Sequence, residues 1–97
     1  MRQNPVKHRL QSGEVSLGTF VFEFDTTGIS RIAGQAGAEF VIYDMEHTGW
    51  SIETIRALIA TTPPTGPVPL VRVPAVEYHF IARVLAVGAM GLMFPTV

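Results

Sequence analysis

Two hydrophobic patterns alternate along the chain. Short runs rich in aromatic and β-branched residues are typical of strands, and they occur at residues 17–24, 40–43, 68–73 and 90–94. Between these runs, apolar residues recur three and four positions apart, which predicts helices over residues 29–36, 52–59 and 77–87. The pattern therefore predicts the order β-α-β-α-β-α-β, preceded by a polar segment with a short helix around residues 7–11.

Residues that begin or end helices support these boundaries. Ser51 can cap the second of the three helices, because its hydroxyl can accept a bond from a free backbone N–H of the first turn. Gly37 and Gly88 follow the first and third helices, where glycine commonly takes a left-handed conformation. Residues 61–67 (TTPPTGP) cannot continue a helix and are predicted to connect the second helix to the third strand.

Strands that alternate with helices predict a parallel sheet with right-handed crossovers, and so an α/β fold. Four strands are half the number of an eight-stranded (β/α)8 TIM barrel, and a small open α/β sheet is the alternative. Periodicity alone does not choose between these two architectures. No helix follows the fourth predicted strand, so the chain looks truncated after that strand.

Composition narrows the class of function. The net charge is −1, which argues against nucleic acid as a partner. The chain has no cysteine, which excludes disulfides and thiolate metal sites within it. Apolar runs are too short for a membrane span, which needs about 20 residues. We therefore expect a cytoplasmic protein without a membrane partner.

Polar residues follow the predicted strands where parallel α/β folds place their chemistry. Asp44, Glu46 and His47 come after the second strand, and Arg72 lies near the end of the third. An imidazole ionises near neutral pH, so His47 could act as a general base with Asp44 orienting its ring. Arg72 could bind a carboxylate or enolate oxygen, and Glu46 could hold a water or contact a metal shell. A capped, solvated loop is the alternative for the three residues after the second strand.

Three segments resemble one enzyme family. They are residues 36–47 (AGAEFVIYDMEH), 69–74 (PLVRVP) and 84–95 (VLAVGAMGLMFP), and Asn4, Pro5 and Gly18 fit the opening of the same family. The chain resembles the amino-terminal portion of the metal-dependent hydroxy-keto-acid aldolases. This family includes the 4-hydroxy-2-oxoheptanedioate and 2-keto-3-deoxy sugar-acid aldolases and is related to the citrate lyase beta subunit.

The resemblance implies that residues 1–97 form a single partial TIM barrel domain, truncated after its fourth strand, and it assigns the site. His47, assisted by Asp44, would be the catalytic general base. Arg72 would bind the keto oxygen and stabilise the enolate. We also expect Gly18 and Phe20 to contact substrate, although Phe20 could instead pack in the core. The divalent cation of the family (Mg²⁺, Mn²⁺ or Co²⁺) would have its ligands beyond Val97, so we expect no complete metal site in this chain.

The implied parent activity is that of a carbon–carbon lyase, which cleaves a 4-hydroxy-2-keto acid to pyruvate and an aldehyde. The implied partners are these small molecules, and the full-length parent would be a homo-oligomer. Ala86 stands where the family usually has an aspartate. We expect the chain alone to be inactive. The alternative is a non-catalytic half-barrel fragment that associates with a complementary part.

Overall fold

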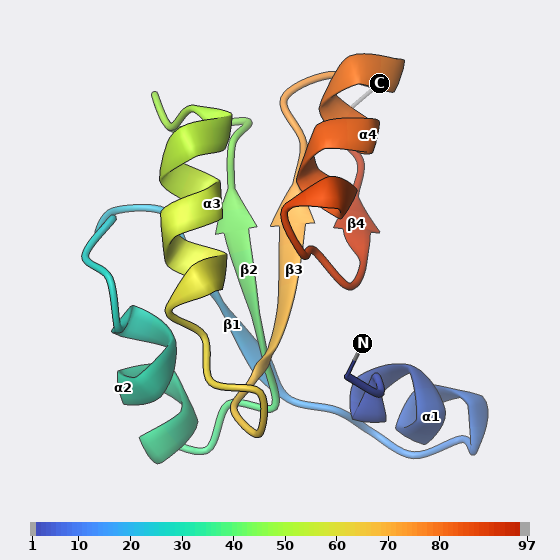
Figure 1. The fold of residues 1–97 in the computed structure, drawn as a ribbon. Coiled ribbons are helices and arrows are strands. Elements are labelled where there is room, and N and C mark those ends of the chain that lie inside the picture. Colours follow the sequence, from blue (N-terminus) through green and yellow to red (C-terminus); the bar gives the residue numbers. More distant parts are fainter. Residues whose placement is uncertain (1, 96–97) are drawn as a thin grey trace.

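The computed structural model describes residues 2–95. It contains four helices and four strands in a single α/β unit (Figure 1). In chain order they are α1 (Pro5–Gln11), β1 (Gly18–Val21), α2 (Ile29–Gln35), β2 (Phe40–Asp44), α3 (Ile52–Ala60), β3 (Val68–Arg72), α4 (Tyr78–Ala86) and β4 (Leu92–Met93). The predicted alternation of strands and helices is confirmed, and α1 is a fourth helix in addition to the three that alternate with strands.

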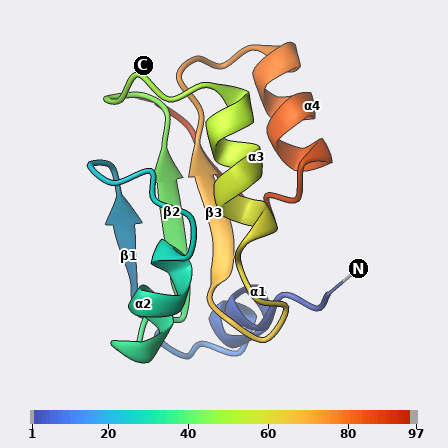
Figure 2. The same ribbon diagram turned by 60° about the vertical axis from the view of Figure 1, so that its left-hand side comes forward.

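The four strands form one parallel sheet in the order β1-β2-β3-β4, and Figure 2 shows β1, β2 and β3 of this sheet side by side. Two strands are shorter than the sequence predicts. β1 ends at Val21, although the aromatic run continues to Phe24, and β4 pairs with β3 only through Leu92 and Met93. Strand length here depends on pairing with a neighbour, and β1 is paired with β2 alone.

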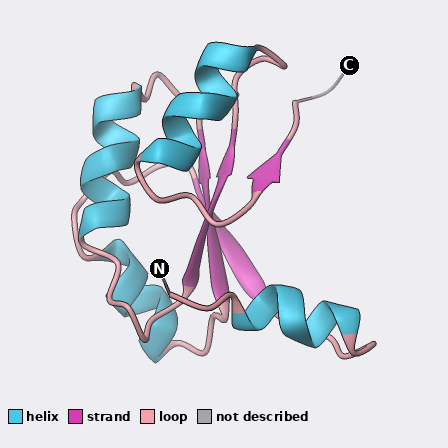
Figure 3. Ribbon diagram, turned by 45° about the vertical axis from the view of Figure 1, so that its right-hand side comes forward, coloured by secondary structure: helices cyan, strands magenta, loops and turns pink. Residues whose placement is uncertain are grey.

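The sheet has helices α2, α3 and α4 on one face, while α1 lies beyond the amino ends of the strands (Figure 3). Each strand also pairs with the next strand in sequence. A doubly wound open sheet reverses its strand order and carries helices on both faces. The observed arrangement is instead that of consecutive strands in a (β/α)8 barrel, which decides between the two predicted architectures.

The hydrophobic core lies between the sheet and the helices. The core contains Val41 and Tyr43 of β2 and Met45, the residue after β2. It also contains α3 residues such as Ile55 and Leu58. Since successive side chains of a strand point to opposite faces, Phe40, Ile42 and Asp44 point to the helix-free face. This alternation brings Asp44 to the face that forms the interior of a barrel.

The helix ends follow the sequence prediction. The Ser51 hydroxyl accepts a hydrogen bond from the backbone N–H of Thr54 at 3.3 Å and caps α3. Gly37 and Gly88 have φ values of +101° and +113°, a region that L side chains rarely adopt. Both glycines therefore permit the turn from a helix into the next strand.

The amino-terminal segment is hydrogen-bonded to the segments that precede β3 and β4, a feature that the sequence pattern does not indicate. The Asn4 side chain accepts a hydrogen bond from the N–H of Lys7 at 3.0 Å and donates one to the carbonyl of Met90 at 3.1 Å. It thereby caps α1 and holds it against the segment that enters β4. The Arg2 guanidinium donates to the carbonyl of Gly66 at 3.0 Å, in the loop before β3.

Within residues 2–95, no helix has both the length and the apolar character needed to cross a membrane.

Replacing Asn4 tests the hydrogen bond that its side chain donates to the carbonyl of Met90. We expect Asn4→Ala to lower the free energy of unfolding by about 2 kcal/mol, because it removes a helix cap and a partly buried hydrogen bond. Ser51→Ala removes only a cap and should cost about 1 kcal/mol. Urea denaturation followed by circular dichroism measures both variants. Equal losses for Asn4→Ala and Ser51→Ala would contradict the proposed tie to Met90.

Candidate active site

The candidate site lies at the carboxyl ends of β2 and β3. Asp44 is the last residue of β2 and Arg72 the last residue of β3, and the two are direct partners in the sheet register. Arg72 Nε donates a hydrogen bond to Asp44 Oδ1 at 2.6 Å. The Asp44 side chain is fully buried, whereas that of Arg72 is 20% exposed. The carboxylate of the pair is therefore shielded from solvent, while the arginine is partly accessible at the rim of the sheet.

Asp44 also organises the loop that follows it. Its carboxylate accepts the backbone N–H of Glu46 on Oδ1 and that of His47 on Oδ2, each at 3.0 Å. The Thr48 hydroxyl donates to the Asp44 carbonyl at 2.7 Å. An aspartate that bonds the backbone two and three residues ahead bends the chain sharply, which places Glu46 and His47 over the rim.

These contacts shift the pKa values of both Asp44 and Arg72. Burial raises the pKa of Asp44, but the hydrogen bonds from Arg72 and from the backbone N–H groups of His47 and Glu46, together with the positive charge of Arg72, outweigh it. The pKa of Asp44 therefore lies below its ordinary value. The hydrogen bond to Asp44 is the main cause that raises the pKa of Arg72. The two groups therefore form a permanent ion pair at neutral pH.

Glu46 connects His47 to this pair. Glu46 Oε1 lies 3.3 Å from His47 Nε2 and 3.4 Å from Arg72 Nε. The His47 side chain is 65% exposed, whereas that of Glu46 is 14% exposed. The site therefore presents an accessible imidazole beside a guanidinium, with a largely buried carboxylate between them.

The sequence predicts a contact between the Asp44 carboxylate and the His47 ring, and the structure places these groups differently. Among the hydrogen bonds of residues 2–95, Asp44 meets His47 only at its backbone N–H, and the ring lies against Glu46. The Asp44 carboxylate instead accepts the backbone N–H groups of the turn, and Glu46 Oε1 lies 3.3 Å from His47 Nε2. Glu46 was predicted to hold a water or contact a metal shell, and no sequence signal singled it out as the partner of the ring.

The two predicted substrate contacts of β1 have different positions. The Phe20 ring lies under Arg72, with the guanidinium carbon 4.9 Å from the ring centroid. Gly18 pairs with Phe40, four residues before Asp44, so it lies about 13 Å below the rim at the strand rise of about 3.3 Å per residue. A Cβ at Gly18 would approach the Phe40 ring to within 2.3 Å, so this glycine makes room for Phe40 and is not brought to the site.

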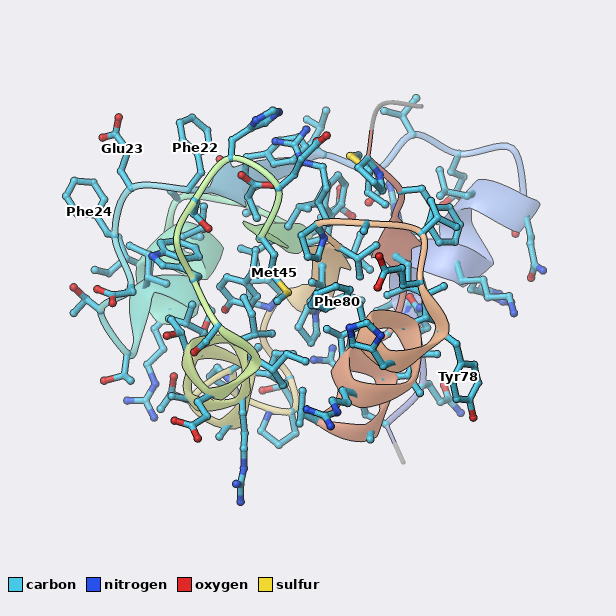
Figure 4. The ribbon with its side chains drawn as sticks, turned by 90° about the horizontal axis from the view of Figure 1, so that it is seen from above. Phe22, Glu23, Phe24, Met45, Tyr78 and Phe80 are labelled. Carbon is cyan, nitrogen blue, oxygen red and sulfur yellow. The ribbon has the colours of Figure 1, made fainter. Side chains whose placement is uncertain are left out.

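The segment after β1 leads away from the site. Figure 4, seen from the rim, shows Phe22 pointing to the helix-free side and Phe24 pointing off the free edge of the sheet. Both rings are largely exposed, at 53% and 62%. An apolar groove of about 650 Å³ lies between this edge and Ile29 and Ile32 at α2. The groove contains none of the residues of the candidate site apart from Phe20.

The described residues by themselves do not fit a divalent-metal site. They include no group of three or more His, Asp or Glu side chains that could hold a metal ion.

Known proteins resemble the chain along nearly its whole length, although no protein-family model matches it. It is 34% identical over 98 residues to the hydroxypyruvate/pyruvate aldolase of Paraburkholderia phytofirmans, covering 97% of this chain and 36% of that protein. It is 30% identical over 94 residues to the 2-keto-3-deoxy-L-rhamnonate aldolase of Escherichia coli K12, covering 97% of this chain and 35% of that protein. The chain thus spans about a third of the length of the curated relatives it matches.

Solved structures show the same relationship. An HpcH/HpaI aldolase from Desulfitobacterium hafniense superposes with a TM-score of 0.86 at 33% identity, over 95% of this chain and 36% of that one. Citrate synthase SbnG superposes with a TM-score of 0.79 at 32% identity, over 95% of this chain and 37% of that one. The fold is that of consecutive β/α units of a TIM barrel. The chain is homologous to the amino-terminal portion of aldolases of the HpcH/HpaI type.

The ion pair should give the fold a defined pH dependence. A carboxyl whose pKa is lower in the folded than in the unfolded state stabilises the fold above its unfolded pKa of about 4, and this contribution is lost as the pH falls through the folded pKa. We expect Asp44→Asn to lower the free energy of unfolding by about 1.5–3 kcal/mol at pH 7. The difference from wild type should shrink in acid.

Urea denaturation between pH 7 and pH 2.5 measures this dependence, with Asp25→Asn as the matched control. Asp25 is exposed, and its replacement should leave both stability and pH profile close to wild type. A difference between wild type and Asp44→Asn that stays constant down to the lowest pH would contradict the assigned ion pair.

Proposed function

We propose that the rim cluster is the keto-acid-binding half of an aldolase site that cleaves a carbon–carbon bond of a 4-hydroxy-2-keto acid. The observation that carries this proposal is the guanidinium of Arg72 held at the carboxyl end of β3 beside an accessible imidazole. The aldolase names of the homologues support the same class of reaction. The substrate is an anion with a carboxylate next to a keto group, which suits a permanently charged arginine.

Arg72 serves as the oxyanion-stabilising group in this proposal. Its bond to Asp44 uses Nε, the nitrogen nearest the side-chain stem, so the terminal nitrogens take no part in that bond. Their N–H groups can donate to the keto oxygen of the substrate, where negative charge develops. A fixed donor aimed at developing charge stabilises the transition state more than the ground state.

His47 serves as the base. When Nε2–H donates to Glu46, the other ring nitrogen carries a lone pair and can accept the proton of the C4 hydroxyl. The O–H electron pair then forms the aldehyde C=O, the C3–C4 bond breaks, and its electron pair forms an enolate whose oxygen Arg72 stabilises. His47 returns the proton to C3, which yields pyruvate and the free aldehyde.

A second candidate function is assembly with a complementary part of a barrel, without catalysis by this chain. The observation in its favour is the exposed apolar material at the two outer strands. Phe22 and Phe24 follow β1, and Met93 and Phe94 lie at β4, all of them exposed. Unpaired backbone groups beside apolar side chains are a template for pairing with another strand.

A hybrid enzyme tests the first proposal. Residues 1–97 are joined to the carboxyl-terminal portion of the Paraburkholderia aldolase, and pyruvate release from a 4-hydroxy-2-keto acid is measured. We expect activity in the hybrid and none in the isolated chain. In the hybrid, Arg72→Ala should lower kcat about 10²–10³-fold through loss of an oxyanion donor. His47→Ala should lower it about 10²–10⁴-fold through loss of the base.

Arg56→Ala is the matched control, because Arg56 is an exposed arginine of α3 outside the site. Its hybrid should keep the activity of the parent hybrid. An active hybrid whose rate is insensitive to both Arg72→Ala and His47→Ala would refute the proposed site.

Self-association tests the second candidate. We expect the isolated chain to associate at micromolar concentration, because burial of each exposed phenylalanine stabilises a complex by about 1.5–3 kcal/mol at most. The double variant Phe22→Lys, Phe24→Lys should shift the chain toward monomer in sedimentation velocity. Tyr78→Lys is the control, since Tyr78 is 86% exposed and points away from the sheet on α4 (Figure 4). A wild-type chain that remains monomeric, or an equal effect of the two substitutions, would count against assembly through the β1 edge.

A further inference from the structure

Phe20 lies where the sheet register brings β1 beneath the end of β3. It pairs with Ile42 of β2, and Ile42 pairs with Leu70 of β3. Arg72 is two residues beyond Leu70, so its side chain points to the same face of the sheet, one step nearer the rim. A long side chain at that position can fold back over the aromatic ring across β2.

The guanidinium of Arg72 makes this contact. Its carbon lies 4.9 Å from the centroid of the Phe20 ring, within the range of a cation–π interaction. At the edge of the guanidinium, Nε bonds Asp44 at 2.6 Å and lies 3.4 Å from Glu46. The cation is thus held by carboxylates at its edge and by an aromatic ring on one side.

The two kinds of contact constrain different motions. A bond through Nε holds one atom of the guanidinium near Asp44 but leaves the group free to turn about the stem of the side chain. A ring beneath the guanidinium restricts that turning, because a tilt moves the cation away from the negative face of the ring. The direction of the terminal nitrogens therefore depends on Phe20.

We propose that Phe20 is a positioning residue, whose ring fixes the orientation of the Arg72 guanidinium toward a bound keto acid. The functional part of this inference rests on the proposed keto-acid site, whereas the orienting contact does not. The assignment replaces the direct substrate contact expected for Phe20. The Phe20 ring has the Arg72 guanidinium over it, 4.9 Å from the ring centroid.

Nuclear magnetic resonance of the Arg72 Nε–Hε group tests the contact in the intact 97-residue chain. In wild type this signal should show the shift caused by a nearby ring and a cross-relaxation peak to the Phe20 ring protons. Phe20→Leu and Phe20→Met should abolish both features, and Phe20→Tyr should retain them. Tyr78→Leu is the control, because it removes an exposed ring of α4 that lies outside the site. Unchanged Arg72 signals in both aliphatic variants would overturn the positioning contact.

Kinetics of the hybrid enzyme test the functional part. We expect Phe20→Leu to lower kcat about three- to thirtyfold with little change in KM, since the contact orients the donor toward the transition state. Phe20→Tyr should keep the rate close to wild type, and Tyr78→Leu should not change it. An active hybrid in which Phe20→Leu changes the Arg72 signals but not kcat would refute the catalytic importance of the ring. A hybrid without activity, even with Phe20 in place, would instead count against the proposed function, and the resonance data would still decide on the contact.

Discussion

The ion pair between Asp44 and Arg72 links the sheet to the chemistry at its rim. Asp44 is fully buried, and a buried carboxylate is costly unless it is paired and hydrogen-bonded. Arg72 and two backbone N–H groups meet that need, and the same bonds shape the loop that carries Glu46 and His47. The hydrogen bonds that satisfy this one buried charge thus help to place the His47 imidazole and the Arg72 guanidinium on the same carboxylate oxygen of Glu46.

The pair depends in turn on the sheet. β2 and β3 are adjacent and parallel, and their register sets Asp44 directly opposite Arg72. The side chains that precede them alternate between the helix-covered core and the helix-free face, so the polar pair ends a row of apolar residues such as Ile42 and Leu70. Helices α2, α3 and α4 cover one face only, as in a segment of a barrel wall (Figure 3). The apolar packing therefore stabilises the strands whose carboxyl ends form the site.

The proposed function and the positioning role of Phe20 follow from the same geometry. A guanidinium that Asp44 holds through Nε can present its terminal nitrogens, and a ring beneath it sets their direction. Glu46 takes the place beside the His47 ring that the sequence pattern suggested for Asp44. The homologous aldolases share this portion of the fold, and the citrate synthase among the solved neighbours shows that the fold also occurs with a different named reaction.

Local patterns in the sequence were enough to predict the order of elements, the parallel sheet, the capping of α3 by Ser51 and the position of Asp44 and Arg72 at the carboxyl ends of neighbouring strands. These features depend on hydrophobic period, turn chemistry and the rule that parallel strands end at the same edge. Only the tertiary structure decided the ends of β1 and β4, the tie from Asn4 to Met90, the position of Gly18 beside Phe40, and the contact of Phe20 with Arg72. Each of these joins residues that lie far apart in the chain, and such contacts depend on strand register and side-chain packing, which local periodicity does not encode.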